Sequence, residues 1–222
     1  FSVDVSRLVA RVSLSSFNTQ FETTGLYPSA EFKITDVFMY KANSTSSVQP
    51  DLTIFPAVTN PIGGIDNLGA ATSYTWLTES IAGTATGGIS ANLLTSKYWF
   101  YVFGNNTTTA TEQTRLVIKG EWDEDGLGFS PGTGGDAVVY YPVVVNQLQP
   151  GTEIKDGATP ITVAGDKKGD GKVYRNCTYD VSVVIKGKGG NTPDENISPA
   201  NLNVSIVPAG WSLDLSQTVV FE

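Results

Sequence analysis

Short segments in which every second residue is apolar recur along this chain of 222 residues, and they constrain its fold more than any other feature. The clearest is VYRNCTYDVSVVIKG, residues 173–187. One parity of this segment is mostly apolar and comprises Cys177, Tyr179, Val181, Val183 and Ile185. Successive side chains of a strand point to opposite faces of a sheet, so the pattern predicts a β-strand with one buried face.

Similar alternation predicts strands elsewhere. In EFKITDVFMY, residues 31–40, Phe32 and Ile34 face inward, Asp36 breaks the apolar parity, and we expect Val37 to carry the core there. Further inward residues are expected in TRLVIKGEW, residues 114–122, and in NLNVSIV, residues 201–207: Leu116, Ile118, Trp122, Leu202, Val204 and Ile206.

Three segments depart from simple alternation. KYWFYVFGN, residues 97–105, is aromatic on both parities, which predicts a strand buried on two faces. VVYYPVVVN, residues 138–146, predicts a buried strand in which Pro142 marks a sheet edge or a bulge. In SYTWLTESIAG, residues 73–83, the spacing of Tyr74, Leu77 and Ile81 predicts a helical face that ends at Gly83.

The opening segment FSVDVSRLVARVSL, residues 1–14, changes phase. Phe1, Val3 and Val5 form its first apolar set, and the second set is Leu8, Ala10, Val12 and Leu14. One extra residue near Ser6 or Arg7 would shift the phase in this way, so we expect a bulge or a break there.

Many short strands separated by turn residues indicate an all-β chain built of β-sandwiches. Residues 105–113, NNTTTATEQ, are polar and lack bulky apolar side chains. We therefore predict a boundary between an N-terminal sandwich domain, residues 1–110, and a C-terminal sandwich domain, residues 111–222.

The net charge argues against a nucleic-acid partner, and the length of the apolar runs argues against a transmembrane segment. The chain has 14 Lys and Arg against 22 Asp and Glu, a formal charge of −8. A nucleic-acid surface needs basic patches that displace counterions, so no nucleic-acid partner is expected. The longest apolar run, residues 137–145, falls well short of the roughly 20 residues of a spanning helix, so no transmembrane segment is expected.

The residues needed for most catalytic sites are missing. The chain has no histidine, which excludes Ser-His-Asp and Cys-His arrangements and histidine-containing zinc sites. Cys177 is the single cysteine and lies on the apolar parity of its segment, so we interpret it as a small core residue. We expect no catalytic residue, no cofactor and no metal site.

Clustered carboxylates are the remaining candidates for chemistry. Asp123, Glu124 and Asp125 lie in WDEDGLG, and Asp166 and Asp170 lie in GDKKGDGK. Their glycine neighbours favour solvated turns. A calcium loop is the sharper alternative, although the ligand spacing of an EF-hand is missing. A carboxylate-dependent enzyme would need such pairs too.

The last segment, WSLDLSQTVVFE at residues 211–222, carries an apolar parity that only Gln217 interrupts: Trp211, Leu213, Leu215, Val219 and Phe221. Pro208 and Gly210 predict a hinge or turn before it. A chain whose front has lost a strand and whose tail carries one can pair head to tail and form a filament. Alternatively, residues 211–222 are the final strand of their own sandwich.

The order of these strand patterns resembles one known family. The segments that carry the resemblance are VSRLVARVSL, EFKITDVFMYKA, YWFYVFGN, TRLVIKGEW, YYPVVVN, VYRNCTYDVSVVIKGKGG and LNVSIVPAGW. Together they cover most of the chain and resemble the Bacteroidales fimbrillins, the FimA-type or type V pilins, and similar fimbrillin-like surface proteins.

The resemblance implies two transthyretin-like, Greek-key β-sandwich domains in tandem, although the first domain is shorter here than in the family. It also implies export as a lipoprotein precursor and proteolytic removal of an N-terminal segment, which makes Phe1 the new terminus. Phe1, Val3 and Val5 would then border an acceptor groove, and residues 211–222 of another subunit would fill it.

The implied location is an extracellular fimbrium anchored at the outer membrane. The implied partners are other fimbrial subunits, with a host or bacterial surface receptor as a further partner. A competing interpretation is a tip adhesin or a surface glycan-binding protein, in which Tyr74, Trp76, Trp99 and Tyr101 stack on sugars.

Overall fold

We describe the fold from a computed structural model of the 222-residue chain. The structure describes residues 7–21, 24, 26–43, 46, 61–62, 78–85, 89–90, 94, 97–148, 152–154, 169–198 and 201–210.

The described residues form strands joined by turns and loops, which confirms the prediction of an all-β chain. The strands are β1 (Val9–Gln20), β2 (Glu31–Tyr40), β3 (Ala42–Asn43), β4 (Pro61–Ile62), β5 (Thr78–Ala85), β6 (Ile89–Ser90), β7 (Tyr98–Phe103), β8 (Arg115–Asp123), β9 (Ala137–Val144), β10 (Thr152–Ile154), β11 (Cys177–Ile185) and β12 (Leu202–Gly210). A short 3-10 turn, η2 (Ala110–Glu112), precedes β8. Within the described part, no helix is long and apolar enough to cross a membrane.

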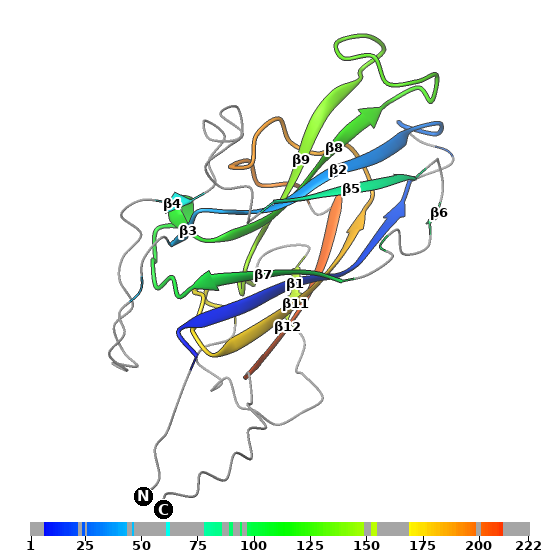
Figure 1. Ribbon diagram of the computed structural model, residues 1–222. Coiled ribbons are helices and arrows are strands. Elements are labelled where there is room, and N and C mark those ends of the chain that lie inside the picture. Colours follow the sequence, from blue (N-terminus) through cyan, green and yellow to red (C-terminus); the bar gives the residue numbers. More distant parts are fainter. Residues whose placement is uncertain are drawn as a thin grey trace, which may run out of the picture.

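Two sheets lie face to face as the layers of a sandwich (Figure 1). Sheet A has the order β10-β12-β11-β1-β6, with β7 also paired to β1, and sheet B has the order β5-β2-β8-β9. Strand β1 lies inside sheet A, parallel to β11 on one side and antiparallel to β7 on the other. A separate two-stranded ladder joins β3 and β4.

Strands from both sides of the predicted domain boundary share both sheets. In sheet A, β1 pairs with β11, and in sheet B, β2 pairs with β8 along its whole length. The division into residues 1–110 and 111–222, and the two tandem transthyretin-like domains, stay predictions. The described strands on either side of residue 110 enclose one main hydrophobic core.

Aromatic side chains join the two layers within this core. The rings of Phe17 in β1 and Phe32 in β2 lie 5.8 Å apart across the two layers, and Phe32 also meets Tyr141 of its own sheet edge to face at 5.4 Å. Trp122 is fully buried and contacts Phe21 edge to face at 5.3 Å. Burial of one large apolar side chain contributes roughly 1.5–3 kcal/mol, so these contacts hold the sheets together.

The predicted inward faces of β8, β11 and β12 are confirmed. All the expected apolar residues are buried: Leu116, Ile118, Trp122, Tyr179, Val181, Val183, Ile185, Leu202, Val204 and Ile206. Cys177 is half-buried against the core, as expected of a structural cysteine. Pro142 lies in β9, the edge strand of sheet B, where a missing N–H does not break an inner ladder.

Two strands contain register shifts, and only the shift in β2 lies where the sequence suggested a break in the alternation. In β2 the register shifts between Ile34 and Asp36, and Val37 is fully buried, as predicted. In β1 a shift between Leu14 and Ser16 moves burial from the even to the odd residues. The bulge predicted near Ser6 falls at the border of the described residues, and residues 1–6 lie outside them.

The helix predicted over residues 73–83 is wrong for its described part. Residues 78–85 form strand β5, which pairs antiparallel with β2 at, for example, Ile34↔Gly83. Helix propensity is a weak preference, and pairing with β2 satisfies the backbone of both strands. Tyr74 and Leu77 lie outside the described residues.

Two other expectations are corrected. Strand β7 is buried on one face only: Phe100 and Val102 are buried, whereas Trp99 and Tyr101 are 44% and 51% exposed. The turn predicted at residues 207–210 is part of β12, which pairs with β11 as far as Gly210. Pro208 is tolerated there because β10 pairs with β12 only over Val204–Ile206.

Candidate assembly site

The residues predicted to polymerise the chain are adjacent in the sequence to described strands. Residues 211–222, with Trp211, Leu213, Leu215, Val219 and Phe221, follow β12 and are outside the described residues. Phe1, Val3 and Val5 precede β1 and are also outside them. The described strands therefore fix where these two segments join the sandwich.

Both segments join sheet A at the same end. Arg11 of β1 is aligned with Thr178 of β11, which is aligned with Ala209 of β12. Because β1 runs parallel to β11 and β12 runs antiparallel to it, the start of β1 and the end of β12 lie together (Figure 1). Only β11 separates them, a distance of roughly 10 Å at about 4.8 Å per strand spacing.

The turn that leads into β11 anchors this end. Asn176, at a positive φ of 58°, donates its N–H to the carbonyl oxygen of Val9 at 2.9 Å. Two residues earlier, the Tyr174 N–H donates to the hydroxyl of Tyr179 at 2.9 Å. Burial raises the pKa of Tyr179 well above its usual value, so this hydroxyl stays neutral. The start of β1 is thus hydrogen-bonded to the turn that precedes β11.

The outer side of β12 is open at this end among the described residues. Strand β10 covers β12 only at Val204–Ile206, so no described strand lies beside Val207–Gly210. Strand β7, on the other side of β1, likewise pairs with β1 alone among the described strands. Unpaired sheet edges are templates for pairing with another chain.

By contrast, the loop that follows β11, which contains Lys188 and Gly190, covers the edge of sheet B at β9. Tyr140 and Gly190 exchange backbone hydrogen bonds of 2.8 and 3.0 Å, which pairs the loop with the strand. Lys188 fixes the loop at one end through an ion pair with Glu124 at 3.0 Å. A covered edge cannot accept another strand, so the candidate edges among the described strands are those of sheet A and the outer side of β5, which pairs only with β2.

A polar cluster that the sequence did not single out fixes the other end of this loop. Arg115 is buried and donates from Nη1 to the carbonyl oxygens of Pro193 and Asp194 at 3.3 and 3.0 Å. Burial lowers the pKa of Arg115, and the charge of Asp194 opposes this. Lys41 forms an ion pair with Asp194. The sequence signal was Arg115 directly before the apolar run Leu116–Ile118.

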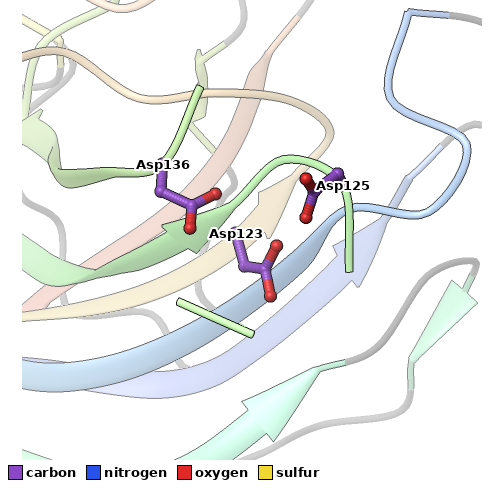
Figure 2. A group of neighbouring side chains, drawn as sticks. All are labelled: Asp123, Asp125 and Asp136. Atoms are coloured by element: carbon purple, nitrogen blue, oxygen red, sulfur yellow. The ribbon is translucent and has the colours of Figure 1, made fainter. Parts of the chain in front are cut away.

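The acidic segment at residues 123–125 lies at the end of β8 and the start of the β8–β9 loop, which also contains Asp136. Carboxylate oxygens of Asp123, Asp125 and Asp136 lie within 4.8 Å of one another (Figure 2). Asp123 and Asp136 are brought together because Trp122 and Ala137 are paired across the hairpin. The interpretation as a solvated turn is right for Asp125, which is exposed, and wrong for Asp123, which is 4% exposed.

Backbone N–H groups of the loop donate hydrogen bonds to both buried carboxylates, Asp123 and Asp136. Asp123 accepts from the N–H of Gly126 and of Gly128, each at 2.8 Å. Asp136 accepts from the N–H of Glu124 at 3.0 Å and of Ser130 at 2.6 Å. These bonds account for the burial of both groups and fold the loop.

The second acidic segment also serves a turn. Asp170 accepts from Asn146 Nδ2 at 3.1 Å and from the N–H of Lys172 at 3.0 Å. Asp166, the other carboxylate of this segment, lies outside the described residues.

The aromatic residues of the competing glycan-binding interpretation are partly placed. Trp99 and Tyr101 are exposed side by side on β7, whereas Tyr74 and Trp76 lie outside the described residues.

Comparison with known proteins relates this chain to fimbrial subunits. No protein-family model matches the sequence. The chain is 30% identical over 183 residues to the major fimbrium subunit FimA type-5 of Porphyromonas gingivalis, which covers 74% of this chain and 41% of the relative. It is 40% identical over 79 residues to a FimA type-4 subunit of the same species, covering 35% of this chain and 18% of the relative. The chain thus spans less than half the length of these relatives.

Solved structures show the same fold. A fimbrilin (FimA) of P. gingivalis W83 aligns with a TM-score of 0.60 and 22% identity, covering 93% of this chain and 58% of that one. A candidate cell adhesion protein of Parabacteroides distasonis aligns with a TM-score of 0.57 and 18% identity, covering 93% and 60%. In both sequence and fold, the chain belongs to the fimbrillin family of the Bacteroidales.

Proposed function

We propose that this chain is part of a structural subunit of a bacterial surface fimbrium, which polymerises head to tail through its C-terminal segment. The observation that carries the proposal is the course of β12. This strand reaches Gly210 at an open part of the edge of sheet A, and the alternating segment 211–222 follows it directly. Similarity to major fimbrium subunits supports the same role.

In this proposal residues 211–222 pair with a sheet edge or groove of a second subunit. Their backbone completes a hydrogen-bonded ladder, and the apolar parity fills the groove. Each large apolar side chain contributes roughly 1.5–3 kcal/mol when buried, so several of them make dissociation slow. The role is structural rather than enzymatic, and its place is a fimbrium on the cell surface, anchored at the outer membrane.

An assembly assay tests this function. The full chain and a version that stops after Gly210 are incubated at high concentration, then compared by unheated denaturing gel electrophoresis and electron microscopy. We expect ladders and filaments from the full chain alone. If the full chain stays monomeric and the shortened chain loses thermal stability, residues 211–222 belong to their own sandwich and the proposal fails.

A further inference from the structure

The outer face of sheet A carries two neighbouring aromatic side chains that the assembly proposal does not use. Trp99 and Tyr101 lie two residues apart on β7 and therefore point to the same side. They are 44% and 51% exposed, while Phe100 and Val102 between and beside them point into the core. A large aromatic surface left in water at two adjacent positions is a common mark of a binding surface.

The neighbouring strand holds the indole of Trp99 in place. The register puts Arg11 of β1 opposite Tyr101, and Ser13 opposite Trp99. The guanidinium carbon of Arg11 lies 4.2 Å from the centroid of the Trp99 ring. A cation on one face of the ring leaves its exposed area on the opposite face and at the edge. The ring is thus pre-oriented, which lowers the cost of binding a ligand against it.

Two charged side chains lie beside the aromatic pair: Asp180 on β11, the strand on the other side of β1, and Lys97 just before β7. Asp180 of β11 is aligned with Ser13 and accepts a hydrogen bond from its hydroxyl. Lys97, just before β7, approaches the same carboxylate at 3.5 Å. The side chains of Lys97 and Asp180 are 46% and 37% exposed, so both retain hydrogen-bonding capacity toward a ligand.

The charged side chains on this face indicate which kind of ligand it suits. Lys97 and Asp180 are paired with each other, and Arg11 is stacked on Trp99. A surface of mixed and mutually paired charges suits a neutral, hydroxyl-rich ligand better than a highly charged one. Flat aromatic rings with adjacent donors and acceptors match a sugar ring, which has an apolar C–H face and hydroxyl groups around its rim.

We propose that the outer face of β7, β1 and β11 is a saccharide-binding surface. A hexose ring stacks on Trp99 and Tyr101, and its hydroxyls exchange hydrogen bonds with Asp180 and Lys97. Residues 211–222 contribute none of the residues of this surface, so substitutions on the surface and in that segment test the two proposals separately. A fimbrium built of such chains would present one copy of the surface per subunit.

The test is a binding screen of the full chain against immobilised oligosaccharides of two to six residues, one set neutral and one containing uronic acids. Isothermal titration calorimetry then measures the affinity of the strongest neutral binder in solution. Trp99→Ala and Tyr101→Ala should each weaken binding at least tenfold, and Trp99→Phe should retain most of it. Asp180→Asn should weaken binding while leaving the aromatic pair intact.

Leu127→Ala is the matched control, because Leu127 is 87% exposed and lies in the β8–β9 loop. It should bind like the unmodified chain, and circular dichroism should show every variant folded. Three outcomes would overturn the proposal: no saccharide bound at millimolar concentration, binding only to the uronic-acid set, or unchanged affinity in Trp99→Ala and Tyr101→Ala. If these variants alter self-association instead, the surface is an interface between copies.

Discussion

The hydroxyl of Tyr40 donates a hydrogen bond to the carboxylate of Asp194, with Oη and Oδ2 2.6 Å apart. This contact ties the end of β2 to the loop that covers the edge of sheet B. Burial alone would raise the pKa of Asp194, but hydrogen bonds from Lys41 and Tyr40 and the charges of Lys41 and Arg115 hold it below its usual value of 3.8. The folded chain therefore favours the ionised carboxylate.

A lowered pKa in the folded state makes this contact sensitive to acid. Its contribution is fully present above the unfolded pKa of 3.8 and is lost as the pH falls through the lower folded value. Asp194→Asn should reduce the free energy of unfolding at pH 7 by about 1 kcal/mol, the upper range for an exposed ion pair. Urea unfolding at pH 7 and pH 3 should show the difference shrinking at the lower pH.

Glu112→Gln is the control for this experiment, since Glu112 is an exposed carboxylate in the η2 turn. It should leave unfolding unchanged at both pH values. An equal deficit of Asp194→Asn at pH 7 and pH 3 would show that ionisation is not the cause.

The second prediction concerns the β8–β9 loop. Asp136 accepts two backbone N–H bonds while being 6% exposed, so Asp136→Ala leaves the amides of Glu124 and Ser130 without that acceptor. Hydrogen bonds to a charged group contribute roughly 1.5–3 kcal/mol each, so we expect a loss of at least 1.5 kcal/mol in urea unfolding. Asp125→Ala, at an exposed carboxylate with one loop bond, should cost less. Equal losses would refute this assignment.

The third prediction concerns Gly120, where β8 passes β2 closely. A Cβ at this position would lie 2.3 Å from Cζ of Phe32 and 2.4 Å from the carbonyl oxygen of Lys33. The backbone oxygen cannot move without breaking the ladder, so Gly120→Ala should destabilise the fold by roughly 1–3 kcal/mol. Thermal unfolding measures this loss. Val138→Ala, at a partly exposed position on β9, should change stability much less.

Strand periodicity predicted the parts of the fold that depend on local alternation. The phase change at Asp36 and the burial of Val37 followed from the sequence because one extra residue inverts every later side chain. The inward faces of β11 and β12 followed for the same reason. These features depend on neighbours in the sequence.

Features that depend on distant strands could not be predicted in this way. Residues 78–85 form a strand because they pair with the edge of β2, and the sequence of that segment alone does not indicate this pairing. Trp99 is exposed because its side of β7 is the outer face of sheet A, whereas Phe100 points into the core, and the apolar sequence on both parities does not tell these two faces apart. Asp136 joins Asp123 only through the closure of a hairpin.

The last prediction separates the two interpretations of residues 211–222 at single positions. In the assembly proposal the apolar parity enters another subunit, so a charge there should prevent filaments while the monomer stays folded. Leu215→Asp and Val219→Asp should each abolish ladders on the unheated gel, because a buried unpaired carboxylate costs several kcal/mol. Thr218→Asp lies on the opposite parity and should still assemble. Filaments formed by Leu215→Asp would rule out this parity as the buried face, whereas loss of monomer stability in that variant would place the segment in its own sandwich.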